Sequence, residues 1–247
     1  MSHTALRRVV VRLLHDPALV DRLADDPAAA LAGTELSPEE RTWLVAVPAA
    51  AWRTDPDRPR RVLAVLRDEY AASVALAPAH AERFFRSTHF HGAIQGDGGS
   101  LAIAFGLHMA DAADARVVAV ARLELATAAV RRAPRRVPPS APGSLRLTPT
   151  ARVVRVPGGA AALLAAVRSG AALAPLRTAE EPLLVVRTPD THAVTVEGLE
   201  DGLAALLGGA TVAVPRAQLE SLLRSLGASA DEAVEVIERL MADGLLI

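Results

Sequence analysis

Histidines with a spacing suited to metal binding occur once in this chain, in the run Thr88-His89-Phe90-His91. Two imidazoles separated by one residue can bind the same metal ion from an extended segment. No Asp or Glu follows them at a spacing typical of a third ligand, and His108 is no better placed. We therefore expect no metal site and no bound cofactor.

Glycine-rich and basic runs are the next candidates for chemistry. Gly96-Asp97-Gly98-Gly99-Ser100 precedes a helical pattern, where backbone N–H groups can hold a phosphate. A phosphate-binding Walker loop also needs a lysine before its Ser or Thr, and no lysine lies between Gly99 and Ser100. Arg131, Arg132, Arg135 and Arg136 could contact phosphates, but cations also suit the end of a helix. We therefore expect the glycine-rich run to connect two helices and the arginine run to lie at a solvated helix end.

The composition excludes several classes of activity. The chain has 247 residues and no cysteine, which excludes thiol nucleophiles, thiolate zinc sites and disulfides and favours a cytoplasmic location. A formal net charge of -1 gives no overall basic field for nucleic acid, and no apolar run is long enough to span a membrane. No Gly-x-Ser-x-Gly elbow or paired carboxylates in a site-like setting are found. We expect a binding protein that is not itself an enzyme, with neither nucleic acid nor membrane as its partner.

Residues 1–133 show the signals of an all-helical domain. Asp16-Pro17 and Asp26-Pro27 each place an N-cap acceptor before a proline at the first helical position. Ser37 and Glu40 form a capping box, and Leu101, Phe105, His108 and Met109 recur at helical spacing. Residues 134–144, rich in Pro and Arg, are expected to be an interdomain linker.

Residues 145–247 change to strand patterns followed by helical ones. Leu145–Val156 alternates, and Pro182–Arg187 and His192–Val196 flank a turn at Thr188-Pro189-Asp190. Leucines at helical spacing then predict three helices, of which the third follows a capping box from Ser229 to Glu232. Gly208-Gly209, Gly227 and Gly244 are expected at the helix ends. The whole chain is predicted to be α+β, with an all-helical N-terminal domain followed by a winged-helix-like domain.

The C-terminal patterns resemble a known peptide-recognition module. The runs Leu183-Leu184-Val185-Val186-Arg187-Thr188-Pro189-Asp190, Leu206-Leu207-Gly208-Gly209 and Val236-Ile237-Glu238-Arg239-Leu240-Met241-Ala242-Asp243-Gly244-Leu245 are similar to the PqqD-like element of ribosomally made, modified peptides. The resemblance covers about the last 70 residues. It implies that residues 145–247 bind a leader peptide.

The N-terminal half adds a second resemblance. Val120-Ala121-Arg122-Leu123-Glu124-Leu125-Ala126 and Val130-Arg131-Arg132 are similar to the helical domain of proteins that accompany multinuclear non-haem iron oxidative enzymes. In such pathways the companion binds the precursor peptide and presents it to a separate iron-dependent TIM-barrel enzyme. The resemblance implies that this chain is a non-catalytic partner subunit, forming a heterodimer with such an enzyme.

These expectations name candidate residues. The strand from His192 is chosen as an open edge for an added peptide strand, with Val194 and Val196 on one face and with Glu235 and Arg239 reading charges from the third helix. The acidic bias of that helix favours a leader that carries Lys or Arg. Phe84, Phe85 and Phe90 are candidates for the partner interface, since aromatic residues anchor interfaces, although a core role is equally compatible with their pattern.

The alternative function is that of a winged-helix DNA-binding regulator. Asp231, Glu232, Glu235 and Glu238 outnumber Arg239 on the third helix, which disfavours contact with phosphates.

Overall fold

The computed structural model describes residues 4–55, 57–95, 100–134, 141–188, 191 and 193–247. Its helices and small antiparallel sheets give an α+β fold, as the sequence predicts. The chain divides into two compact units, Met1–Ala121 and Arg122–Ile247. None of the described helices is long and apolar enough to cross a membrane.

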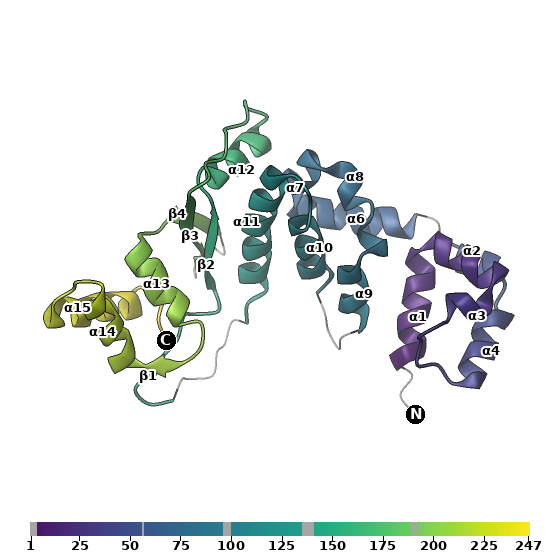
Figure 1. The fold of residues 1–247 in the computed structure, drawn as a ribbon, viewed down its shortest axis with the longest axis horizontal. Helices are drawn as coiled ribbons and strands as arrows, with labels where there is room; N and C mark the ends of the chain where they lie inside the picture. Colours follow the sequence, from purple (N-terminus) through teal and green to yellow (C-terminus); the bar gives the residue numbers. More distant parts are fainter. Residues whose placement is uncertain (1–3, 56, 96–99, 135–140, 189–190, 192) are drawn as a thin grey trace. The chain divides into compact units, whose positions relative to one another are not determined.

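Among its described residues, the first unit contains only helices, which lie in the purple to blue-green part of Figure 1. They are α1 (Thr4–His15), α2 (Pro17–Asp25), α3 (Pro27–Ala30), α4 (Pro38–Ala46), α5 (Ala49–Trp52), α6 (Arg58–Glu69), α7 (Ala71–Leu76), α8 (Pro78–Ala81), η1 (Phe84–Arg86), α9 (Thr88–Gln95), α10 (Leu101–Ala110) and the start of α11 (Ala115–Arg132).

The predicted helix starts are confirmed in atomic detail. Asp16 accepts a hydrogen bond from the N–H of Ala18, and Asp26 accepts one from the N–H of Ala29. Ser37 and Glu40 form both bonds of the capping box at the start of α4. Val62, Leu66, Tyr70 and Val74 recur at the spacing of one continuous helix. The structure interrupts this helix at Tyr70, which separates α6 from α7 with φ −116° and ψ 40°.

The second unit is built around an antiparallel sheet in the order β2-β3-β4. Its strands are β2 (Ala151–Pro157), β3 (Glu180–Arg187) and β4 (Val194–Gly198), and α12 (Ala160–Ser169) joins β2 to β3. The β3–β4 hairpin agrees with the predicted pair of strands. The sequence pattern predicts no element for residues 160–169, so α12 is an addition to the expected fold.

Helices α13 (Asp201–Gly209), α14 (Arg216–Ser225) and α15 (Ala230–Ala242) follow the sheet, which is the predicted order. Short strands β1 (Ser144–Leu145) and β5 (Val214–Pro215) pair beside them, and Leu147 forms a bridge with Leu246. Gly227 and Gly244 lie at helix ends with positive φ, but Gly208 and Gly209 are the last residues of α13 and Ala210 is its cap.

Each face of the sheet is covered within the second unit. Leu184 belongs to a core shared with α13, α14 and α15, whereas Val185 packs against Ala126 and Val130 in the second half of α11. The boundary between the units therefore lies inside α11. The linker predicted at residues 134–144 lies further along the chain than this boundary, and its residues 135–140 lie outside the described part of the chain.

Candidate peptide-binding site

Strand β4 forms one edge of the sheet, as the sequence analysis expected for this segment. The N–H of Thr188 donates to the carbonyl of Ala193 at 2.8 Å, and the N–H of Leu199 donates to the carbonyl of Pro182 at 3.0 Å. Since the backbone groups of an antiparallel strand alternate in direction, those of Val194, Val196 and Gly198 point away from β3. No described residue is a hydrogen-bond partner for these outward groups.

The two faces of β4 differ in character. Val194 and Val196 are half-buried on the face that packs against the second half of α11. Thr195 and Glu197 are exposed on the other face, and the Thr195 hydroxyl donates to a Glu197 carboxylate oxygen at 3.1 Å. The predicted placement of Val194 and Val196 on one face is therefore confirmed. A strand added at this edge would extend one apolar face and one polar face.

The structure does not place the third helix beside this edge. Figure 1 shows α13 between the sheet on one side and α14 and α15 on the other. Glu235 and Arg239 lie one helical turn apart on α15, where an Arg239 nitrogen approaches a Glu235 oxygen at 3.0 Å and both side chains are exposed. The predicted groove between β4 and these two residues is thus wrong, because α13 is the helix that packs on β2 and β3. His192, its other predicted member, lies outside the described residues.

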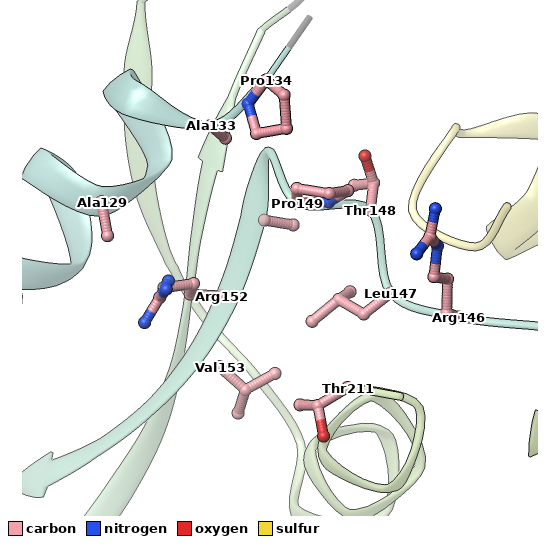
Figure 2. A pocket seen from close by; sticks show the side chains of 11 residues that line it. Ala129, Ala133, Pro134, Arg146, Leu147, Thr148, Pro149, Arg152, Val153 and Thr211 are labelled. Carbon is pink, nitrogen blue, oxygen red and sulfur yellow. The ribbon is translucent and has the colours of Figure 1, made fainter. Parts of the chain in front are cut away.

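A pocket of about 430 Å³ lies at the opposite edge of the sheet, along β2. Figure 2 shows Ala129 of α11, Arg152 and Val153 of β2, Thr211 after α13, and the segment Arg146–Pro149 around it. The two arginines lie on opposite sides of the hollow. No motif in the sequence indicates this site, because its residues come from separate segments of the chain.

The outer edge of β2 contributes backbone groups to this pocket. The N–H of Arg187 donates to the carbonyl of Thr150 at 2.9 Å, which fixes the register of the hydrogen-bonded pairs. Val153 is one of the residues whose N–H and C=O point away from β3. These two groups have no hydrogen-bond partner within the described ranges.

The aromatic residues proposed as a partner interface are core residues of the first unit. Phe84, Phe85 and Phe90 are 0%, 5% and 0% exposed, and their rings pack against one another. Buried rings offer no surface to a partner, so the predicted interface role is not supported. Trp43, at 51% exposure, is the large aromatic residue that this unit does present to solvent, at an edge-to-face angle to buried Trp52.

His89 and His91, the pair with metal-binding spacing, lie in different surroundings. The Nε2–H of His89 donates to a carboxylate oxygen of Asp111 at 2.6 Å. Burial lowers the pKa of His91, and the nearby charge of Arg12 lowers it further. Within the described part of the chain, no three His, Cys, Asp or Glu side chains are grouped so that they could hold a metal ion.

The third helix bears on the DNA-binding alternative. Asp231, Glu232, Glu235 and Glu238 are all exposed on α15, as the sequence analysis anticipated. A helix with this surface repels a phosphate backbone. Comparison with known proteins adds no assignment, since no family model and no curated protein matches this chain.

Proposed function

We propose that this chain is a non-catalytic recognition subunit that binds a precursor peptide and presents it to a separate iron-dependent oxidative enzyme. Its second unit binds the leader part of the peptide by adding it as a strand to β4. The observation that carries the proposal is the outward direction of the backbone groups of Val194, Val196 and Gly198. The identity of the enzyme partner rests on the resemblance of the helical half to companion proteins of iron enzymes.

Strand addition suits this edge for two physical reasons. An unpaired row of N–H and C=O groups binds any extended chain through main-chain hydrogen bonds, so leaders of varied sequence can be accepted. The half-buried Val194 and Val196 continue an apolar surface onto which alternate side chains of the peptide can pack. The exposed Thr195 and Glu197 leave the opposite face polar.

The experiment uses the whole chain and, as its probe, a fluorescein-labelled leader segment taken from any short precursor peptide that is encoded beside its gene. Val194→Pro and Val196→Pro each remove one outward N–H donor, and neither removes a donor to β3. We expect each variant to bind the leader more weakly by about 1 to 3 kcal/mol in fluorescence anisotropy. Circular dichroism serves as the folding control.

Val194→Ala and Val196→Ala are the matched variants, because they shorten the same side chains and keep the N–H groups. They should bind the leader more tightly than the proline variants do. Full affinity in the folded proline variants would remove β4 as the binding edge. The partner is tested separately, by co-expression with any iron-dependent oxidative enzyme whose gene lies beside this one, followed by gel filtration. Separate elution at micromolar concentration would contradict the subunit role.

A further inference from the structure

The outer edge of β4 is complementary to itself. Its outward backbone groups belong to Val194, Val196 and Gly198, which are spaced evenly about Val196. An antiparallel second copy of β4, related by a two-fold axis through Val196, would place Val196 opposite Val196 and Val194 opposite Gly198. The two residues of each such pair exchange both of their N–H···O bonds. Every outward group of β4 in both copies is then paired.

The side chains on the polar face of β4 fit the same arrangement. With Val196 at the axis, Thr195 of one copy lies opposite Glu197 of the other, in a pair without main-chain bonds, where side chains come closest. Within one chain the Thr195 hydroxyl donates to a Glu197 carboxylate oxygen at 3.1 Å, so these two groups already match. Glu197 is the charged residue of β4. Because it faces a threonine and not another glutamate, the pairing brings no like charges together.

The apolar face of β4 also accepts a second copy. Val196 would meet its own equivalent, and a pair of β-branched residues is favourable across strands. Val194 would meet Gly198, where an added Cβ would have no atom within 4 Å. This open space leaves room for the Val194 side chain of the other copy. Pairing would therefore cover two valines that are only half-buried in the single chain.

The opposite edge of the sheet does not offer the same contact. Arg146–Pro149 and Thr211 lie around the outer edge of β2 (Figure 2), so other segments of the chain flank it. On β4, Thr195 and Glu197 are exposed, since α13 packs on β2 and β3. Within the described part of the second unit, β4 is therefore the more open edge for another copy.

We propose that β4 pairs with β4 of a second copy of this chain, about a two-fold axis through Val196, and that this dimer excludes the leader peptide. Pairing joins the two sheets into one, in the order β2-β3-β4-β4-β3-β2. The exclusion rests on the proposed function, because both partners use the same backbone groups. One pair of short strands gives a small interface, so the dimer dissociates on dilution and a leader can replace the second copy.

Sedimentation velocity of the whole chain, from micromolar to submillimolar concentration, tests the dimer. We expect a reversible equilibrium between monomer and dimer. Thr195→Glu places a glutamate opposite Glu197 on both sides of the axis, so it should raise the dissociation constant of the dimer about tenfold. Ser221→Glu adds the same charge at an exposed position of α14 and should leave the equilibrium unchanged. A wild-type chain that is monomeric throughout this range would overturn the proposal.

A double variant tests the position of the axis. In Thr195→Glu with Glu197→Thr, each glutamate again faces a threonine, and the net charge of the wild-type chain is kept. This variant should restore most of the dimer that Thr195→Glu loses. An axis at Val194 or Gly198 would not bring positions 195 and 197 together. A double variant that dimerises as weakly as the single one, with both folded by circular dichroism, would therefore overturn the axis at Val196.

A fluorescein-labelled peptide with the sequence of residues 193–199 probes the edge without a second copy. It should bind the wild-type chain in fluorescence anisotropy and dissociate the dimer, and Val196→Pro should weaken its binding by removing the donor on the axis. A dimer that persists in excess peptide would overturn the pairing.

The leader segment distinguishes this inference from the proposed function. It should dissociate the dimer as the β4 peptide does. A dimer that the β4 peptide dissociates and the leader does not would support the pairing and contradict β4 as the leader site. Leader binding by a chain that is monomeric at every concentration would overturn the pairing and leave the proposed function supported.

Discussion

His80 and His108 stack face to face, with ring centroids 4.2 Å apart and planes within 6° of parallel. The Nε2–H of each ring donates to the backbone carbonyl of the other residue, at 2.8 Å in both directions. The Nδ1 of His80 accepts a hydrogen bond from the Arg83 guanidinium at 3.0 Å. The two hydrogen bonds and the stacked rings link α8 to α10.

The first prediction concerns acid stability. Burial lowers the pKa of His108, and it also lowers the pKa values of His15 and His91, all from an ordinary value of 6.5. The unfolded chain then binds protons more readily than the folded chain, so stability is complete above about pH 6.5 and falls as the pH decreases towards the folded pKa values. Thermal unfolding followed between about pH 8 and pH 5 should show the melting temperature decline only in the acidic part.

The variant His108→Gln tests how much His108 contributes to this loss of stability in acid. The glutamine amide keeps a donor for the His80 carbonyl and does not titrate. The decline in melting temperature on acidification should be smaller in this variant than in the wild-type chain. Parallel curves for the two proteins would show that His108 makes no contribution.

The second prediction separates core aromatics from exposed ones. Phe90 is 0% exposed within the phenylalanine cluster, and Phe90→Ala should lower the free energy of unfolding by about 3 to 5 kcal/mol through lost contacts and a cavity. Trp43 is 51% exposed, so Trp43→Ala should cost less than about 1 kcal/mol in the isolated chain. Urea unfolding measures both. Similar costs for the two variants would contradict this division.

If the first unit docks on an enzyme partner, Trp43 is a better candidate for the contact than the three buried phenylalanines, because its side chain is exposed. Trp43→Ala should then weaken co-elution with the partner and leave the melting temperature close to that of the wild-type chain. Undiminished co-elution would exclude Trp43 from the interface.

The third prediction concerns the capping box of α15. Ser229 accepts from the N–H of Glu232, and Glu232 accepts from the N–H of Ser229, at 3.2 Å and 2.7 Å. Ser229→Ala should lower the free energy of unfolding by about 1 kcal/mol. Ser221→Ala is the control, because this exposed serine lies inside α14 and alanine is well accepted there. An equal effect of the two substitutions would contradict the capping role.

Local signals in the sequence predicted the local structure well. Asp16, Asp26, Ser37 and Ser229 all cap helices where their spacing indicated, because a cap depends only on residues within one turn. The β3–β4 hairpin and the order of strands before helices followed from pattern in the same way. Tyr70 shows the limit, since periodicity continued through a position where the helix breaks.

Relationships between distant segments were not predictable from the sequence. The pattern of Phe84, Phe85 and Phe90 fits a core as well as an interface, and burial by other helices decides between them. The separation of β4 from α15 depends on α13 packing over the sheet. The pocket along β2 combines residues 129 to 211, and each is unremarkable in its own segment.

The sequence pattern did not predict helix α12, and the reason differs from that for the distant contacts. Half of its residues are alanine, which the rest of the chain also contains in abundance, and its boundaries are glycines without a side-chain cap. Gly159 and Gly170 flank it, and both have positive φ, at +89° and +68°. A pair of glycines about ten residues apart around an apolar stretch is the signal that could have revealed this helix.

The last prediction uses these two glycines to separate backbone conformation from close packing. A Cβ at Gly159 would lie 3.0 Å from the carbonyl oxygen of Pro175, whereas one at Gly170 would have no atom within 4 Å. Gly170→Ala should therefore lower the free energy of unfolding by about 1 kcal/mol, the cost of a left-handed conformation for alanine. Gly159→Ala carries the same cost and must also displace the loop that holds Pro175. It also risks the hydrogen bond of 3.0 Å from the Gly159 N–H to the Glu181 carboxylate. Urea unfolding should thus rank Gly159→Ala as clearly less stable than Gly170→Ala, and equal stability would show that the approach of Pro175 to Gly159 places no constraint on this turn.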